Sequence, residues 1–296
     1  MRITAVSYLN TLPFIYGIEQ QAALSSSVAA GHAVPRVRET GMPLAGEDIA
    51  LSLRVPSLCA ADAIAGETDI ALVPVAAIPL IPGFSVSSVR PGSPSDGFIP
   101  RIITDYCIGA EGPVDTVVLL SDTPLADVRR VYLDSHSRTS VQLVRVLARE
   151  HWRLAPEWVD SADCVSDAAP QGRPLEPGEA MVAIGDKVFG LKAGHHYAYC
   201  YDLAQEWHDF TGGLPFVFAA WVACSGAGLS FAPILNRALA YGVGHIAESV
   251  AGTVNRSRDF EFARAYRYLT KSIQFDLDDR KRQAMRLFWE KIITPG

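Results

Sequence analysis

The sequence predicts an α/β protein in which buried strands alternate with helices. Two observations support this prediction. Apolar runs of strand length recur over the first 220 or so residues, and a helical periodicity follows several of them. After about Ser230 the chain becomes mainly helical. Since strands that alternate with helices usually pair in parallel, we expect parallel sheets followed by a helical tail.

The expected strands share a short apolar run bounded by polar residues, Gly or Pro. In chain order they are Ile3–Val6, Ala50–Arg54, Asp69–Val73, Tyr106–Gly109, Val117–Leu120, Val131–Leu133, Ala180–Ile184 and Phe216–Val222. Helices are expected from Pro13, from Pro56 to a stop at Gly66, and across Tyr201–Trp207. The stretch Ala22–Glu47 predicts irregular structure with a strand near Val34–Val37.

The last part of the chain predicts three helices. Ile234, Leu235, Ala238, Leu239 and Val243 fall on one helical face, and Phe260, Ala263, Ala265, Tyr266 and Leu269 fall on another. Asp276 or Asp278 caps a final helix whose inward residues are Met285, Leu287, Phe288 and Ile292. This order of elements indicates two α/β lobes, with the last segment packed back on the first.

Composition excludes several classes of protein. The 296 residues are 49% hydrophobic and 20% charged, as in a compact protein with a substantial core. A net charge of −6 without a basic cluster argues against nucleic acid. No run approaches the roughly 20 apolar residues of a membrane span. The five cysteines are scattered and the N-terminus has no secretory pattern, so we expect reduced thiols and a cytoplasmic protein.

Motifs for common chemistries are missing from the sequence. The adjacent His195 and His196 would point to opposite sides of a strand, and no other His has a carboxylate at metal-ligand spacing, so no metal is expected. There is no Gly-x-Ser-x-Gly elbow, no Walker loop and no Gly-x-Gly-x-x-Gly. We therefore expect no nucleotide and no other cofactor.

The most informative stretch is Val131–Leu147. An apolar strand runs into a hydroxyl-rich loop and then into a helix, so the free N–H groups of the first helical turn can face an anion. Ser137, Thr139 or Ser140 can cap that helix or donate to a carboxylate, and Arg138 can bind one through two hydrogen bonds. The alternative is an ordinary helix cap beside an exposed arginine.

Two further strand ends carry polar residues. Ser7, Asn10 and Thr11 follow the first strand, where they can cap a helix or face a ligand. Gly185 and Asp186 follow the strand Ala180–Ile184; the glycine permits close approach of a ligand, and Asp186 is either a ligand contact or a cap. If the three loops share a cleft, they form a pocket for a small polyanion.

Four segments resemble a known family. Ser-Tyr-Leu-Asn-Thr-x-Pro at 7–13, Ser-Arg-Thr-Ser at 137–140, Ile-Gly-Asp at 184–186 and Leu-Pro-Phe-Val-Phe-Ala at 214–219 resemble chorismate dehydratases (MqnA) of the futalosine route to menaquinone. The matching blocks keep their order between residue 3 and about residue 223. The chain departs from the family in having Gly212-Gly213 where the family has one glycine, and Ala22–Glu47 matches nothing in it.

The resemblance implies a fold like the type II periplasmic binding proteins, with a ligand in a central cleft between two lobes. The implied lobes are 1–115 with 213–296, and 116–212. We expect Val117–Leu120 and Phe216–Ala219 to be the crossover strands.

The resemblance also implies a cofactor-independent hydro-lyase that removes water from chorismate to give 3-[(1-carboxyvinyl)oxy]benzoate. Ser137, Arg138, Thr139 and Ser140 would hold a carboxylate of this dicarboxylate substrate, while Asn10 with Ser7 and Thr11 would orient the ring or the departing hydroxyl. The base is either the enolpyruvyl carboxylate of the substrate or His136.

Two other functions stay open. One is a carboxylate-binding protein without chemistry, since the same fold is mostly used for binding. The other is the related 1,4-dihydroxy-6-naphthoate synthase, over which the segments at 7–13 and 137–140 favour the dehydratase. The sequence does not indicate an oligomeric state.

Overall fold

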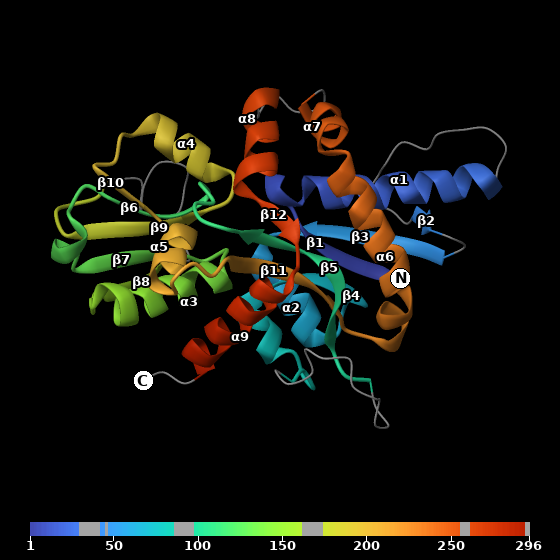
Figure 1. The fold of residues 1–296 in the computed structure, drawn as a ribbon, viewed down its shortest axis with the longest axis horizontal. Coiled ribbons are helices and arrows are strands. Elements are labelled where there is room, and N and C mark those ends of the chain that lie inside the picture. The colour runs from blue at the N-terminus through green and yellow to red at the C-terminus, as the bar shows by residue number, and fades with distance from the viewer. Residues whose placement is uncertain (30–41, 45–46, 86–97, 162–173, 255–260, 294–296) are drawn as a thin grey trace. The chain divides into compact units, whose positions relative to one another are not determined.

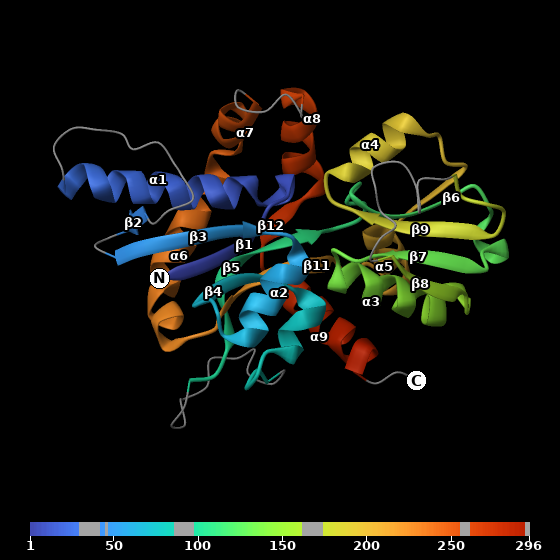
Figure 2. The ribbon, with the colours of Figure 1, turned by 180° about the vertical axis from the view of Figure 1, so that it is seen from behind.

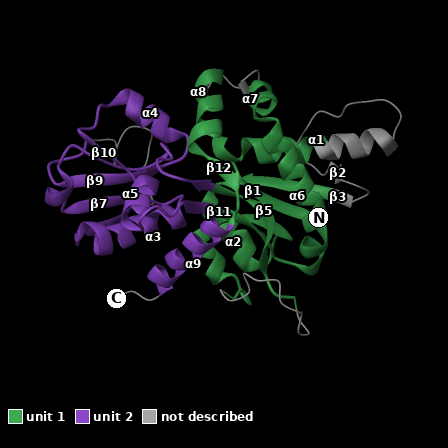
Figure 3. Cartoon of the chain, in the orientation of Figure 1, with its two compact units in different colours: residues 1–108, 219–278 green, residues 109–218, 279–296 purple. Residues whose placement is uncertain are grey.

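The chain divides into two compact units. The computed structural model describes residues 1–29, 42–44, 47–85, 98–161, 174–254 and 261–293 (Figure 1). Unit 1 contains Met1–Ile108 and Ala219–Asp278, and unit 2 contains Gly109–Phe218 and Asp279–Gly296 (Figure 3). The chain therefore crosses the boundary three times, after residues 108, 218 and 278.

Unit 1 is built on a seven-stranded mixed sheet with the order β12-β5-β11-β4-β1-β3-β2. The strands are β1 (Arg2–Val6), β2 (Met42–Leu44), β3 (Glu47–Arg54), β4 (Ile70–Pro74), β5 (Arg101–Ala110), β11 (Phe216–Ala223) and β12 (Gln274–Asp276). β1 pairs in parallel with both β3 and β4, whereas β11 runs antiparallel to β4. The carboxyl ends of three neighbouring strands thus meet at one edge.

The helices of unit 1 are α1 (Leu12–Ala29), α2 (Pro56–Ala65), α6 (Gly226–Gly244), α7 (Ile246–Val254) and α8 (Phe262–Arg267). Close packing of α1 on α6 fixes the start of α1, which directly follows Asn10 and Thr11. A Cβ on Gly17 would overlap the backbone of Ala238, and one on Gly242 would overlap that of Pro13. Only glycine permits these two helices to approach so closely.

Unit 2 has a five-stranded sheet with the order β10-β6-β9-β7-β8. Its strands are β6 (Val117–Ser121), β7 (Arg130–Asp134), β8 (Glu157–Ser161), β9 (Glu179–Ile184) and β10 (Tyr199–Asp202). β7 is parallel to both β8 and β9, and β6 is antiparallel to β9 and β10. The carboxyl ends of β7 and β9 therefore lie side by side.

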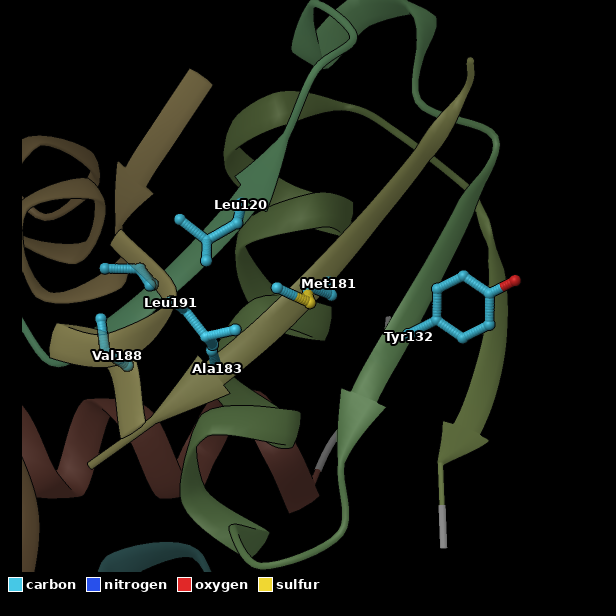
Figure 4. Packing of buried hydrophobic residues seen from close by; sticks show 7 residues of the cluster. Leu120, Tyr132, Met181, Ala183, Val188 and Leu191 are labelled. Carbon is cyan, nitrogen blue, oxygen red and sulfur yellow. The ribbon is translucent and has the colours of Figure 1, made fainter. Parts of the chain in front are cut away.

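Helices cover both faces of this sheet. They are α3 (Arg138–Val146), α4 (Lys187–Gly194), α5 (Leu203–Phe210) and α9 (Asp279–Ile293), with α4 on one face and α3 on the other (Figure 2). The α4 face holds a buried cluster (Figure 4): Val118, Leu120, Tyr132, Met181, Ala183, Val188 and Leu191. Because Val188 and Leu191 are buried here, the start of α4 is anchored against β9.

The final helix, α9, belongs to unit 2. Phe288 packs edge-on against Trp207 at 5.9 Å and against Phe216 at 5.1 Å between ring centroids. All three rings are at most 1% exposed. The expected packing of the last segment on the first lobe was therefore wrong for α9, because its aromatic face is buried by α5 and the start of β11. Aromatic pairs of this geometry stabilise beyond the area that they bury.

Most expected elements appear, with several corrections. Val117–Leu120 is not a crossover: it lies in β6, inside unit 2, and β5 carries the first boundary, because that strand continues past residue 108. The boundary at 218/219 falls within β11, which contains the second expected crossover. The irregular region expected from Ala22 is helical as far as Ala29, and the strand expected near Val34–Val37 lies outside the described residues.

Candidate functional site

The loop after β7 is shaped by a helix cap. Ser137 precedes α3 in an extended conformation, and its Oγ accepts a hydrogen bond from Ser140 N at 2.9 Å and donates one to Ser140 Oγ at 2.8 Å. Thr139 Oγ1 donates to Phe218 O at 3.2 Å. Ser137 is thus the cap among the three hydroxyl residues considered, and all three are at most 6% exposed.

Arg138, in contrast, is exposed at the first position of α3. An arginine at a helix N-terminus combines a forked cationic donor with the partial positive charge of the free N–H groups. This end of α3 is therefore suited to a carboxylate, and the three buried hydroxyls hold its backbone in place. His136 is exposed two residues earlier.

The loop after β9 lies beside this one. Gly185 has a positive φ of 69°, and its N–H donates to Thr116 O at 2.9 Å. Asp186 then occupies the N-cap position of α4, but its side chain makes no capping hydrogen bond, so the interpretation of Asp186 as a cap was wrong. The adjacent, parallel ends of β7 and β9 bring Arg138 and Gly185-Asp186 to the same edge of the sheet.

Asp134 and Lys187, which sequence reasoning did not single out, link the two loops. Asp134 is 1% exposed. Its Oδ1 accepts a hydrogen bond from His136 N at 3.1 Å, and its Oδ2 accepts one from Ile184 N at 3.2 Å. Lys187 Nζ lies 2.5 Å from the same Oδ2, although no hydrogen-bond geometry is formed. The sequence contained one signal for Asp134: it is an acidic residue directly after a buried apolar run.

The loop after β1 lies in unit 1. Ser7 is exposed, and its N–H donates to Arg54 O at 2.9 Å, which places it at the carboxyl ends of β1 and β3. Thr11 is fully buried, with its Oγ1 2.5 Å from Val6 O and 2.7 Å from Tyr8 O, so its hydroxyl is used by the backbone. The convergence of this loop with the two loops of unit 2 stays a prediction.

Asn10 is the most suggestive residue of that loop. Its Oδ1 is buried and has no hydrogen-bond partner among the described residues. An amide oxygen removed from water without a donor costs about 1–3 kcal/mol. A hydroxyl of a bound substrate is the kind of donor that would satisfy it.

A separate cavity of about 530 Å³ lies further along α3. It is lined by Arg145, Arg149, Leu154, Ala155 and Trp158, none of which is a candidate residue. Arg145 lies over the Trp158 ring at 5.7 Å, a cation–π contact that accounts for its position.

Among the residues that the structure describes, no group of three or more His, Cys, Asp or Glu side chains is arranged to hold a metal ion. Within the same residues, no helix is both long and apolar enough to cross a membrane.

Comparison with known proteins identifies both family and fold. A family model described as menaquinone biosynthesis matches residues 100–293, which is more than half of the chain. Protein AF1704 from Archaeoglobus fulgidus has a TM-score of 0.63 at 12% identity, covering 98% of this chain and 95% of its own.

Two more distant structures show the same fold. An ABC transporter from Parabacteroides distasonis has a TM-score of 0.52 at 13% identity, covering 100% of this chain and 95% of its own. A Candida albicans gene product, CA3427, described as having the generic periplasmic binding protein fold, has a TM-score of 0.53 at 9% identity, covering 100% and 91%. The expected periplasmic-binding-protein-like fold is confirmed.

Proposed function

The chain belongs to the menaquinone biosynthesis family, and we propose that it is a chorismate dehydratase. The reaction removes a proton from the ring carbon that bears the enolpyruvyl ether and hydroxide from the neighbouring carbon, so that water leaves and 3-[(1-carboxyvinyl)oxy]benzoate forms. Because the product ring is aromatic, the step is strongly favourable and needs no net oxidation or reduction. A hydro-lyase without a cofactor is the activity proposed.

The observation that carries this proposal is the start of α3. Arg138 is exposed beside a capped helix N-terminus, at the strand ends where α/β proteins bind ligands. Chorismate carries two carboxylates, and this corner suits one of them. The Ser-Arg-Thr-Ser and Ser-Tyr-Leu-Asn-Thr segments support the dehydratase over the related naphthoate synthase.

The remaining roles follow from what each residue offers. We assign Arg138 to a carboxylate, with the Gly185-Asp186 turn beside it. Asn10 and Ser7 are assigned to the ring or the departing hydroxyl, which fits the unsatisfied Oδ1 of Asn10. Positioning and electrostatic stabilisation can supply much of the rate. We also propose that the protein is cytoplasmic, because scattered cysteines are typical of proteins whose thiols stay reduced.

The proton acceptor divides the proposal into two forms. In one the enolpyruvyl carboxylate of the substrate takes the proton, and in the other His136 does. Replacing His136 with Gln separates them. If turnover collapses while chorismate still binds, His136 is the base; if turnover persists, the carboxylate of the substrate is.

The direct test is to mix the purified protein with chorismate and follow formation of the benzoate product by absorbance and mass spectrometry. Product at a rate above the spontaneous background supports the dehydratase. Binding without product supports a carboxylate-binding protein, the alternative that the shared fold suggests. Absence of both binding and product overturns both functions.

A further inference from the structure

We propose that Asp134 is the positioning residue of this site, with Lys187 as its counter-charge. The inference rests on the proposed function and adds to it two residues that do not need to touch the substrate. Asp134 follows directly after the last apolar residue of β7, and its carboxylate is buried at the point where both polar loops of unit 2 begin.

Its carboxylate joins three segments of chain. Oδ1 accepts from the backbone of the His136–Arg138 loop at 3.1 Å, and Oδ2 accepts from the last residue of β9 at 3.2 Å. Lys187, on the first turn of α4, lies 2.5 Å from Oδ2. The start of α3, the end of β9 and the start of α4 are therefore held by one side chain.

A carboxylate is needed for this arrangement. Ionised Asp has two oxygens that both accept, whereas Asn has one acceptor and one donor. An amide at position 134 would direct its NH2 group at either the His136 N–H or the Ile184 N–H, so one of these donors would lose its partner. The loop carrying Arg138 would shift, and a displacement of about 1 Å can cost roughly a hundredfold in rate.

Lys187 supplies a positive charge beside this carboxylate. The Lys187 side chain is 17% exposed and that of Asp134 is 1% exposed, so the pair is largely removed from water. A buried charge that loses its partner is strongly destabilising. Removal of Lys187 would leave Asp134 without a cation and loosen the same two loops.

A matched control exists on the same two strands. Glu179, at the start of β9, is 4% exposed and accepts hydrogen bonds from Tyr132 Oη at 2.8 Å and from Glu176 N at 2.9 Å. It lies opposite Arg130, at the amino end of β7, and also accepts a hydrogen bond from Arg130 Nη1 at 3.4 Å. Glu179→Gln therefore disturbs a comparable buried carboxylate far from the strand ends that carry the candidate site.

The first experiment compares Asp134→Asn with Glu179→Gln. For each variant, kcat and KM for chorismate are measured together with the thermal unfolding midpoint. We expect Asp134→Asn to lower kcat/KM by about tenfold to a hundredfold, and Glu179→Gln by less than about twofold, at similar losses of stability. Equal losses of kcat/KM in the two variants would show that Asp134 acts through stability alone and overturn the proposal.

Lys187 provides a second test that does not depend on the folding of Asp134→Asn. Lys187→Met should lower kcat/KM by roughly tenfold, and Lys187→Arg, which keeps the charge, should restore most of it. If Lys187→Met has wild-type kcat/KM, the counter-charge role is wrong.

Hydrogen exchange separates failure of this inference from failure of the proposed function. If the wild-type protein does not convert chorismate, the dehydratase assignment fails, and the role of Asp134 is judged on amide exchange alone. Asp134→Asn should accelerate exchange at His136 or Ile184, or at both, and leave Glu176 unchanged, whereas Glu179→Gln should do the reverse. Unchanged exchange at both His136 and Ile184 in Asp134→Asn contradicts the positioning role.

Discussion

The two ends of the β7–β9 pair hold similar buried carboxylates in different surroundings. At the amino end, Glu179 binds Tyr132, the backbone of its own turn and the Arg130 guanidinium. At the carboxyl end, Asp134 binds the loop before α3, the end of β9 and Lys187. The comparison shows that burial of an acid does not identify a site. The segments that the acid connects, and the strand end at which it lies, do so.

The largest expected difference between the two ends of the β7–β9 pair is the loss of kcat/KM when an arginine is removed from each end. Arg138→Ala should lower kcat/KM for chorismate by roughly 10–150-fold, because a charge-assisted hydrogen bond is worth about 1.5–3 kcal/mol. Arg129→Ala, which removes a 71% exposed arginine just before β7, is the control and should change kcat/KM less than about twofold. Steady-state kinetics measure both. Similar values for the two variants would leave the carboxylate site at α3 without support.

The next effect concerns stability and tests whether the two ends are independent. Asp134→Asn and Glu179→Gln should each lower the free energy of unfolding by about 1–3 kcal/mol. Glu179 lies opposite Arg130 on β7, and the strand covers about 13 Å from Arg130 to Asp134. At that separation the double variant should show the sum of the two losses to within about 0.5 kcal/mol. Urea unfolding measures this, and a larger deviation would show that the two networks are coupled through the strands.

A smaller effect is expected at the helix cap of the site. Ser137→Ala should cost about 1 kcal/mol of unfolding free energy, because Ser140 N loses its acceptor. It should also raise KM, because the start of α3 frays. Ser225, which caps α6 in unit 1 through Gly228 N at 3.1 Å, is the control. Ser225→Ala should match the loss of stability and leave KM unchanged; a raised KM in both variants would argue against a local effect at α3.

The smallest effect is a pH dependence at the other end of the α3 region. Burial alone would raise the pKa of Glu150, but hydrogen bonds and charge from Lys291 and Arg149 bring that pKa below its ordinary value. A lowered pKa in the folded state means that the unfolded state binds the proton more readily. The stabilisation is therefore present above the unfolded pKa of about 4.3 and is lost as the pH falls through the folded pKa.

Glu150→Gln should accordingly flatten the decline of the unfolding midpoint between about pH 5 and pH 3, without changing kcat/KM near neutral pH. Thermal unfolding across this range measures the slope. An unchanged slope would show that the pairing of Glu150 with Lys291, at 2.5 Å, contributes nothing to stability.

Buried strands were well predicted from the sequence because each is a short, continuous apolar run. Val131–Leu133 and Ala180–Ile184 appear as the cores of β7 and β9. β8 (Glu157–Ser161) and β10 (Tyr199–Asp202) were missed, because they are edge strands with mixed polarity and exposure. The apolar pattern of a strand does not show which strands it pairs with. For this reason β6 was wrongly expected to be a crossover strand.

Only those features of the site that lie within one continuous segment of the chain could be predicted from the sequence. Strand, hydroxyl loop and helix in consecutive residues predicted a cap at Ser137, Thr139 or Ser140, and only the structure assigns it to Ser137. The link from Asp134 to Ile184 spans 50 positions and depends on two strands being adjacent, which no local pattern states. Lys187 was passed over for the same reason.

The placement of α9 affects how the protein is made. Its ring at Phe288 completes the aromatic contact of Trp207 and Phe216, yet it lies much later in the sequence than either of them. A nascent polypeptide emerging from the ribosome therefore carries those two rings without this partner until α9 has been synthesised. Premature termination before α9 would leave an apolar face open to chaperones or to aggregation, even though every candidate site residue had already been synthesised.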